Sequence, residues 1–138
     1  MGTQINMIGI FVEDIQRMVA FYRDVLRFDI DWDGNGPYAE FKQDGVRFSM
    51  YERSQLPGLL GHEPSYPTGI NGTFEIAIEL PTAAKADEMF HRVKSEGARV
   101  VYAPRTEPWG MRSSMVADPE GNLIEIGSWN LGGDTAQQ

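Results

Sequence analysis

The sequence predicts an α+β protein in which one βαβββ unit occurs twice in tandem. Three observations support this: strand-like alternation of apolar residues, helical apolar stripes, and a constant spacing between matching positions in the two halves. In the first half, residues 5–12 alternate as a strand does, and Asp14 is a suitable N-cap for a helix that runs to about Leu26. Shorter strands are then expected over residues 28–33, 38–42 and 46–51.

The same order of elements begins again in the second half. Residues 73–80 alternate in polarity, and Thr82 can cap a helix that runs to Glu96. Gly97 stands where a helix C-cap glycine belongs. Further strands are expected near residues 99–102, 111–117 and 122–128. We therefore expect a single domain with these parts: module one over about residues 4–52, a Pro- and Gly-rich linker or mobile lid over 53–70, module two over about 71–129, and a frayed tail over 130–138.

The spacing between the two halves indicates a duplicated module. Met7 and Glu75 are 68 positions apart, and so are the two predicted helix caps. Near the last turn of each module the spacing becomes 76, which aligns Ser49 with Glu125. A net insertion of eight residues between the second helix and the final turn accounts for the change. Because each helix must cover one face of its sheet, the face that carries these four residues is left for another purpose.

Residues 118–127 combine a tight turn with the last predicted strand. The Asp-Pro-Glu-Gly turn places Pro119 at its second position and Gly121 where a positive φ is tolerated. In the strand that follows, Glu125 has an isoleucine on each side in the sequence. A carboxylate in this place must reach solvent, find a hydrogen-bond partner, or line a cavity in which a charge is wanted.

Composition excludes several classes of function. The chain has 138 residues, 41% hydrophobic and 23% charged, which is ordinary for one globular domain. No apolar run approaches the roughly 20 residues that a membrane span needs, and no secretion signal is evident, so we expect a cytoplasmic protein. The absence of cysteine excludes disulfides, thiolate zinc sites and cysteine nucleophiles. A net charge of −8 argues against nucleic-acid binding and is compatible with a cationic ligand.

Four segments together resemble the vicinal oxygen chelate superfamily, which includes glyoxalase I, bleomycin-resistance proteins, fosfomycin-resistance transferases and extradiol dioxygenases. The segments are IFVED at 10–14, FYRDVL at 21–26, WGMR at 109–112 and DPEGNLIE at 118–125. The resemblance covers residues 5–128. It implies that the two modules form a curved, open barrel around a central cleft, and that the protein is a homodimer, sometimes with modules exchanged. Arg27 replaces the glycine that is common after the first helix, which predicts a strained corner.

In metal-dependent members of that superfamily, four inward positions hold the metal, commonly two His, or His and Gln, with two Glu. The matching positions here are Met7, Ser49, Glu75 and Glu125. A thioether and a neutral hydroxyl are poor ligands for the hard or borderline cations that these enzymes use. We therefore assign no metal ligands and no cofactor, although two carboxylates with several waters could hold a divalent cation weakly.

Aromatic and charged residues favour ligand binding in the cleft that the resemblance implies. Seven aromatic residues lie in the strands or loops expected near its rim: Trp32, Tyr38, Phe41, Phe48, Tyr51, Tyr66 and Trp109. Core packing accounts for more than half of such residues. Tyr51 shares its alternation face with Ser49, so the two point the same way. Arg112 either binds an anionic group of a substrate or forms a surface ion pair.

The sequence thus predicts capture of a small organic ligand, aromatic or cationic, as the bleomycin-resistance proteins do, with no bond made or broken. The expected ligand-binding residues are Met7, Ser49, Tyr51, Glu75, Trp109, Arg112 and Glu125. The alternative is a lyase or isomerase of the glyoxalase I kind, with Glu75 and Glu125 as catalytic residues and a loosely held divalent cation. A third hypothesis is a structural or regulatory dimer whose cleft is filled by its own side chains. The only protein partner expected is a second copy of the chain.

Overall fold

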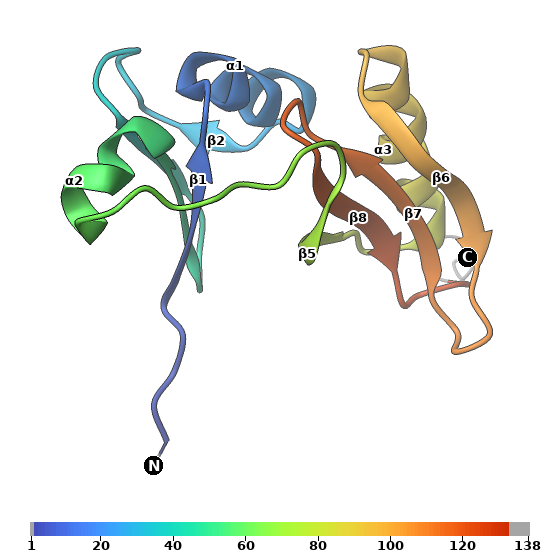
Figure 1. The fold of residues 1–138 in the computed structure, drawn as a ribbon. Coiled ribbons are helices and arrows are strands. Elements are labelled where there is room, and N and C mark those ends of the chain that lie inside the picture. The colour runs from blue at the N-terminus through green and yellow to red at the C-terminus, as the bar shows by residue number, and fades with distance from the viewer. Residues whose placement is uncertain (1, 133–138) are drawn as a thin grey trace. The chain divides into compact units, whose positions relative to one another are not determined.

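The computed structural model describes residues 2–132, and the chain divides between Tyr66 and Pro67 into two compact units. Each unit contains one four-stranded sheet, and neither sheet closes into a barrel (Figure 1). The mixed α+β class with two βαβββ modules is therefore confirmed. Among residues 2–132, no helix is long and apolar enough to cross a membrane.

Unit one contains the first sheet, with the strand order β1-β4-β3-β2. β1 and β4 are parallel, and the other neighbours are antiparallel. The elements are β1 (Met7–Val12), α1 (Ile15–Ala20), a π-helical turn (Phe21–Val25), β2 (Asp29–Ile30), β3 (Tyr38–Lys42) and β4 (Arg47–Glu52). The strands predicted near 38–42 and 46–51 are confirmed within one residue, whereas the strand predicted over 28–33 shortens to two residues.

The ends of the first helix follow from local chemistry. The Asp14 side chain accepts a hydrogen bond from the Arg17 amide at 3.1 Å, so the predicted N-cap is confirmed. The regular α-helix stops at Ala20, earlier than predicted, and the chain continues as a π-helical turn. Arg27 has a φ of 67° and is the only residue other than glycine with a positive φ among those described. The predicted strain at this corner is therefore present in the backbone.

An aromatic cluster fills the space between the first helix and its sheet. The Tyr22 side chain is fully buried, with its ring centroid 5.5–5.9 Å from those of Phe28, Phe41 and Phe48. Phe41 and Phe48 stack at 5.4 Å across β3 and β4. Because side chains alternate along a strand, Arg47, Ser49 and Tyr51 must project from the other face of the sheet.

The segment predicted as a linker or lid contains secondary structure. A 3₁₀ turn (Arg53–Gln55) leads into the short helix α2 (Leu56–Leu60), which ends at Gly61 with a left-handed φ of 82°. Leu56 is buried, and the Tyr66 hydroxyl donates to the Arg53 carbonyl oxygen at 3.4 Å. Residues 53–60 are therefore a folded part of unit one. The lid role stays a prediction.

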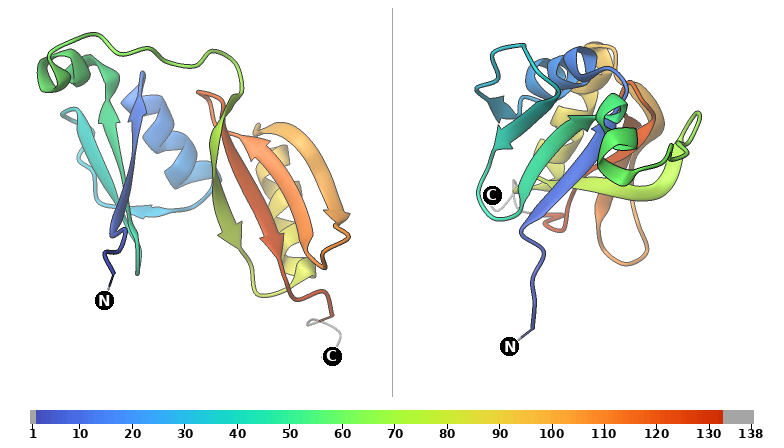
Figure 2. Two further views of the ribbon diagram at one scale, coloured as in Figure 1. Left: turned by 60° about the horizontal axis from the view of Figure 1, so that its bottom comes forward. Right: turned by 60° about the vertical axis from the view of Figure 1, so that its left-hand side comes forward.

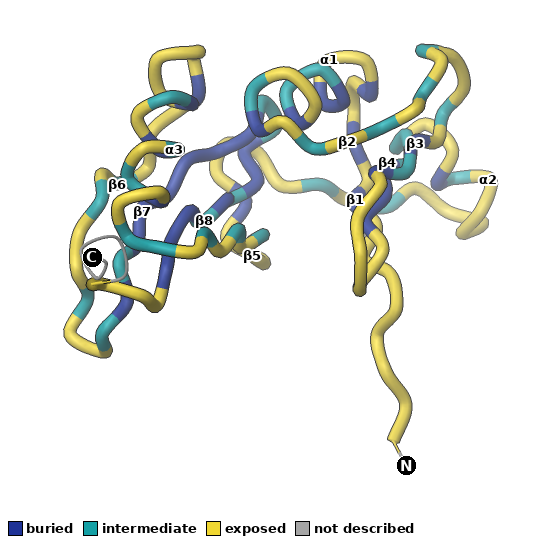
Figure 3. Tube along the Cα trace, turned by 180° about the vertical axis from the view of Figure 1, so that it is seen from behind, coloured by how far each residue is buried: buried dark blue, intermediate teal, exposed yellow. Residues whose placement is uncertain are grey.

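Unit two contains the second sheet, with the strand order β5-β8-β7-β6. Its elements are β5 (Asn71–Glu79), α3 (Ala83–Ser95), β6 (Arg99–Thr106), β7 (Arg112–Ala117) and β8 (Asn122–Ser128). The helix α3 covers one face of this sheet (Figure 2). β7 and β8 are almost continuously buried, whereas the segment before β1 is exposed (Figure 3).

The predicted caps of the second helix are also found. Thr82 Oγ1 accepts from the Lys85 amide at 3.1 Å, and Gly97 has a φ of 100° beyond the helix end. β6 runs to Thr106, beyond the predicted 99–102, because it remains paired with β7 through two register shifts. Of the predicted frayed tail over residues 130–138, residues 133–138 lie outside the described part of the chain. Asn130 itself is held, since its carbonyl oxygen accepts from the Ala83 amide at 2.9 Å.

The strand register supports the alignment of the two modules. Gly9 pairs with Ser49 between the parallel strands β1 and β4, and Ala77 pairs with Glu125 between the parallel strands β5 and β8. These two pairs are related by the spacings of 68 and 76 that the sequence showed. Ser49 and Glu125 therefore occupy the same position in their units, on the face without a helix.

Candidate functional site

In unit one, the two predicted site residues Met7 and Ser49 contact each other. The Ser49 hydroxyl lies 3.7 Å from Met7 Sδ, to which it donates, and Ser49 is only 2% exposed. Gly9 makes this possible, because a Cβ at Gly9 would lie 3.1 Å from Ser49 Oγ. The Ser49 hydroxyl is thus buried within its own sheet and donates its hydrogen bond to the Met7 sulfur.

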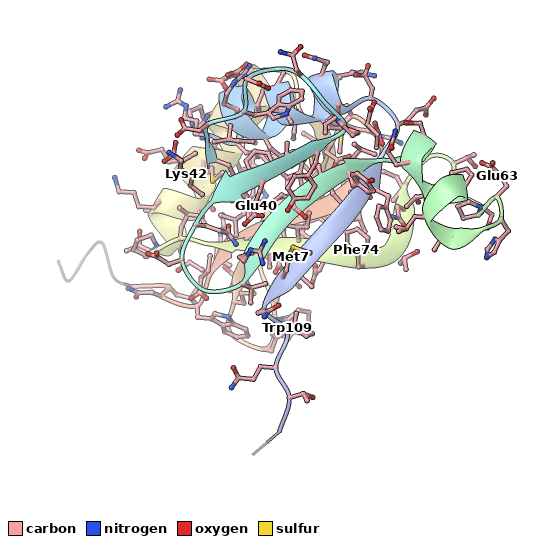
Figure 4. The ribbon with its side chains drawn as sticks, turned by 90° about the vertical axis from the view of Figure 1, so that its left-hand side faces the viewer. Met7, Glu40, Lys42, Glu63, Phe74 and Trp109 are labelled. Carbon is pink, nitrogen blue, oxygen red and sulfur yellow. The ribbon has the colours of Figure 1, made fainter. Side chains whose placement is uncertain are left out.

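Beside this pair lies a charged cluster that the sequence reasoning missed. Arg47 donates twice to the Glu40 carboxylate, at 2.8 Å to each oxygen, and the Tyr38 hydroxyl donates to Glu40 Oε1 at 2.7 Å. Tyr51 contacts the Tyr38 ring edge to face at 6.2 Å. Figure 4 labels Glu40 and Met7 within this sheet. The strand parity that placed Ser49 and Tyr51 also places Arg47 on this face, and that signal could have found it.

These hydrogen bonds lower the pKa of Glu40 to about 2, first through Arg47 and then through Tyr38. Because this pKa lies below the ordinary 4.5, the pair stabilises the fold above pH 4.5, and the stabilisation is lost as pH falls through about 2. We expect the wild type to exceed Glu40→Gln in urea midpoint at pH 7 and this advantage to shrink between pH 4.5 and 2. A constant difference across that range would contradict the assignment.

In unit two, the predicted site residue Glu125 has a hydrogen-bond partner. Ser113 Oγ donates to Glu125 Oε2 at 2.8 Å, and the Tyr102 hydroxyl lies 2.6 Å from the same serine oxygen. Ser113 is 1% exposed. The guanidinium of Arg105 lies 3.9 Å above the Tyr102 ring. The Glu125 carboxylate therefore has a hydrogen-bond partner, and nothing in the sequence pattern indicates that this partner is Ser113.

Glu75 lies on the same face as Glu125, on the neighbouring strand. Glu75 is opposite Leu123 in the register of β5 and β8, and Ala77 is opposite Glu125, so the two carboxylates are diagonal neighbours. Glu75 is exposed and makes no hydrogen bond or ion pair with another residue in the described part of the chain. On this face, Glu125 therefore has a hydrogen-bond partner, whereas Glu75 has none within residues 2–132.

The remaining predicted residues lie elsewhere in unit two. Arg112 precedes Ser113 on β7 and therefore points to the opposite face, where its Nε and Nη2 contact the two Asp87 oxygens of α3 at 2.9 and 2.8 Å. Of the two alternatives for Arg112, the structure shows the ion pair, and it does not place this side chain on the face of Glu125. Trp109 is 63% exposed in the turn between β6 and β7, labelled in Figure 4. The turn is closed by the Gly110 amide, which donates to the Glu107 carbonyl oxygen at 2.9 Å.

The metal that the superfamily resemblance implies fits these residues poorly. Ser49 has committed its hydroxyl proton to Met7, and neither group is a good ligand for a hard or borderline cation. Ser113 occupies one oxygen of Glu125. Within residues 2–132, no three His, Cys, Asp or Glu side chains are grouped so that they could hold a metal ion. We therefore derive no chemical step through a metal.

Two βαβββ units with matching open-face positions define the class of protein. The model of the Glyoxalase/Bleomycin resistance protein/Dioxygenase superfamily matches residues 4–126, and the chain belongs to this superfamily. An uncharacterized protein of Mycobacterium tuberculosis is 33% identical over 126 residues, covering 88% of this chain and 69% of that protein. An uncharacterized protein of Bacillus subtilis is 25% identical over 122 residues, covering 86% and 93%.

Solved structures show the same fold. A glyoxalase/bleomycin resistance protein/dioxygenase from Nocardioides has a TM-score of 0.79 and 22% identity, covering 96% of this chain and 87% of that one. A lactoylglutathione lyase from Agrobacterium tumefaciens has a TM-score of 0.71 and 20% identity, covering 92% and 94%. At these identities the likeness concerns the fold, and function must be argued from the residues.

Proposed function

We propose that this protein captures a small organic molecule and does not transform it. The contact between Ser49 and Met7 carries the proposal, because two of the four positions that hold a metal in catalytic relatives bond to each other instead. The two remaining positions, Glu75 and Glu125, supply negative charge without a second set of metal ligands. Capture alone would give the protection for which bleomycin-resistance proteins are named.

Each open face, taken by itself, carries side chains suited to an aromatic or cationic ligand. The open face of unit one carries the Tyr38 and Tyr51 rings, which contact each other at 6.2 Å and can stack against an aromatic group. Unit two supplies the carboxylates of Glu75 and Glu125. The proposed functional assembly is a homodimer. It is supported by exposed apolar side chains on β1 and β5, each of which is an edge strand of its sheet: Met7, Ile8, Phe11 and Phe74.

A binding experiment tests the capture function. We expect an aromatic ammonium ion to quench tryptophan fluorescence saturably, and Glu125→Gln to weaken its binding about tenfold through loss of one charged partner. Glu88→Gln on the outer surface of α3 is the control for a general change in net charge. Failure of a broad panel of aromatic cations to bind, or equal losses in both variants, would refute the proposal.

A divalent-metal lyase or isomerase is the competing function. The observation that favours it is the pair Glu75 and Glu125 on one face of adjacent strands, with Glu75 unpartnered in the described chain. We expect Mn²⁺, Ni²⁺, Zn²⁺ and Mg²⁺ at micromolar concentration to leave the unfolding temperature unchanged. A clear stabilisation that disappears in Glu75→Gln would favour the enzyme.

A further inference from the structure

We propose that Ser113 and Tyr102 are positioning residues that hold Glu125 so that its free oxygen accepts a hydrogen bond from an ammonium or other N–H group of the ligand. This inference rests on the proposed capture function and adds the chemical class that Glu125 recognises. It concerns three residues on the open face of unit two: Tyr102 on β6, Ser113 on β7 and Glu125 on β8.

The number of hydroxyl protons determines the direction of the hydrogen bonds that link Tyr102, Ser113 and Glu125. An ionised carboxylate can only accept, so Ser113 must donate its single hydroxyl proton to Glu125 Oε2 across 2.8 Å. The short contact of 2.6 Å between Ser113 and Tyr102 could run either way by geometry alone. Since the Ser113 proton is already used, Tyr102 must donate its own. Tyr102 therefore donates to Ser113 and Ser113 donates to Glu125, so that both hydroxyl protons take part in hydrogen bonds.

One oxygen of the Glu125 carboxylate remains available as an acceptor. Glu125 Oε2 is occupied by Ser113, whereas Oε1 has no hydrogen-bond partner in the described chain. The residues opposite Glu125 in the register of its two neighbouring strands are Met115 and Ala77, which offer no donor. A half-buried anion whose directly opposite neighbours offer no donor favours a charge-assisted donor from a ligand, and an ammonium group supplies one.

One face of the Tyr102 ring is covered by Arg105, and the Tyr102 hydroxyl is the group that contacts Ser113. The Arg105 guanidinium lies 3.9 Å from the ring centroid and is itself held by Glu107 at 2.9 Å. That face of the ring is covered by a cation and is closed to a cationic ligand. The same contact fixes the ring, so the phenol hydroxyl stays aimed at Ser113.

Comparison with the first module shows that the fold does not require the hydrogen bonds that link Tyr102, Ser113 and Glu125. In unit one, Tyr38 pairs with Tyr51, just as Ser113 pairs with Gly127 in unit two, so Tyr38 takes the place of Ser113. Ser49 takes the place of Glu125. Unit one therefore forms the same sheet without such hydrogen bonds, which indicates that the bonds between Tyr102, Ser113 and Glu125 have a role beyond packing.

Binding and structure of four variants test the inference. Ser113→Ala removes both hydrogen bonds, Tyr102→Phe removes the terminal donor, and Ser113→Thr keeps the hydroxyl. Ser114→Ala is the matched control, because Ser114 is also 1% exposed but donates to the Ile126 carbonyl oxygen at 2.9 Å on the other face. The probes are benzylammonium and its neutral analogue benzyl alcohol, and the readout is the ratio of their affinities.

We expect Ser113→Ala to reduce the preference for benzylammonium about tenfold and Tyr102→Phe about threefold, with Ser113→Thr and Ser114→Ala within about twofold of wild type. Crystal structures of the variants should show Glu125 displaced in Ser113→Ala and unmoved in Ser114→Ala. If Glu125 keeps its position and the ratio is unchanged in both Ser113→Ala and Tyr102→Phe, the positioning role is refuted. If Glu125 moves but wild type binds neither probe, the ligand class and the proposed capture function fail while the positioning contact stands. Should Ser113→Ala not fold, Tyr102→Phe decides alone.

Discussion

Replacing Gly121 with alanine is expected to lower the free energy of unfolding by about 3–5 kcal/mol. Gly121 has a φ of 88°, and a Cβ there would lie 2.0 Å from the Gly69 carbonyl oxygen and 3.0 Å from its carbon. Backbone atoms cannot rotate away as a side chain can, so the turn or the segment before β5 must shift. That shift would break the 2.8 Å hydrogen bond from the Asn71 amide to the Gly121 carbonyl oxygen.

The duplicated module provides a matched control for this substitution. Gly45 aligns with Gly121 at the spacing of 76 and has a φ of 79°, but nothing lies within 4 Å of a Cβ placed there. Gly45→Ala should therefore cost only the left-handed backbone conformation, about 1 kcal/mol. Urea unfolding of both variants under one set of conditions measures the difference. Equal losses would show that the contact with Gly69 does not constrain the turn.

The sequence predicted this turn because its information is local. Pro119 and Gly121 carry the turn geometry, and the Gly121 amide donates to the Asp118 carbonyl oxygen at 2.9 Å, as expected of a closed turn. The close approach of Gly69 could not be predicted, because it depends on how a segment about 50 residues away packs. Periodicity identifies faces and turn types, whereas contacts between distant segments need the three-dimensional register.

The same difference between local pattern and distant contact explains which candidate-site residues the sequence predicts and which it does not. Alternation and the repeat spacing placed Met7 with Ser49, and Glu75 with Glu125, on common faces, because both depend on counting along the chain. The partner of Glu125 was missed, because Ser113 reaches it only through the register of two antiparallel strands. The charge of Arg112 suggests a ligand-binding role, and its position next to Ser113 on β7 excludes it from the face of Glu125 only once that register is known.

The two modules also differ in how they hold their last turn. In unit two, the buried Asp118 accepts at Oδ1 from the Glu120 and Asn122 amides, at 2.9 and 3.0 Å. Its Oδ2 accepts from Asn122 Nδ2 at 2.9 Å. The equivalent residue of unit one is Lys42, which extends to Asp31 at 2.5 Å on the surface. A buried carboxylate is therefore not needed to form this turn, and in unit two it has a further use.

That use is to attach the edge strand β5. Asn122 accepts at its side-chain oxygen from Asn71 Nδ2 at 3.0 Å, and Asn71 Oδ1 in turn accepts from the Thr73 amide at 3.0 Å. Because the Asn122 side chain donates to Asp118, its oxygen is left facing Asn71. The carboxylate thus determines the orientation of the amide that holds the first residues of β5, the strand that also carries Glu75.

Asp118→Ala should therefore destabilise unit two by about 3–5 kcal/mol, because buried donors on Asn122 lose a charged acceptor. Asp118→Asn should cost about 2 kcal/mol, because one oxygen can still accept the two amides while its amide group opposes that of Asn122. Asp44→Ala, in the exposed equivalent turn, should change the free energy by less than about 0.5 kcal/mol. Urea unfolding gives the three values, and amide exchange at Asn71 and Thr73 reports the attachment of β5. If exchange there is unchanged in Asp118→Ala, the carboxylate does not orient Asn122.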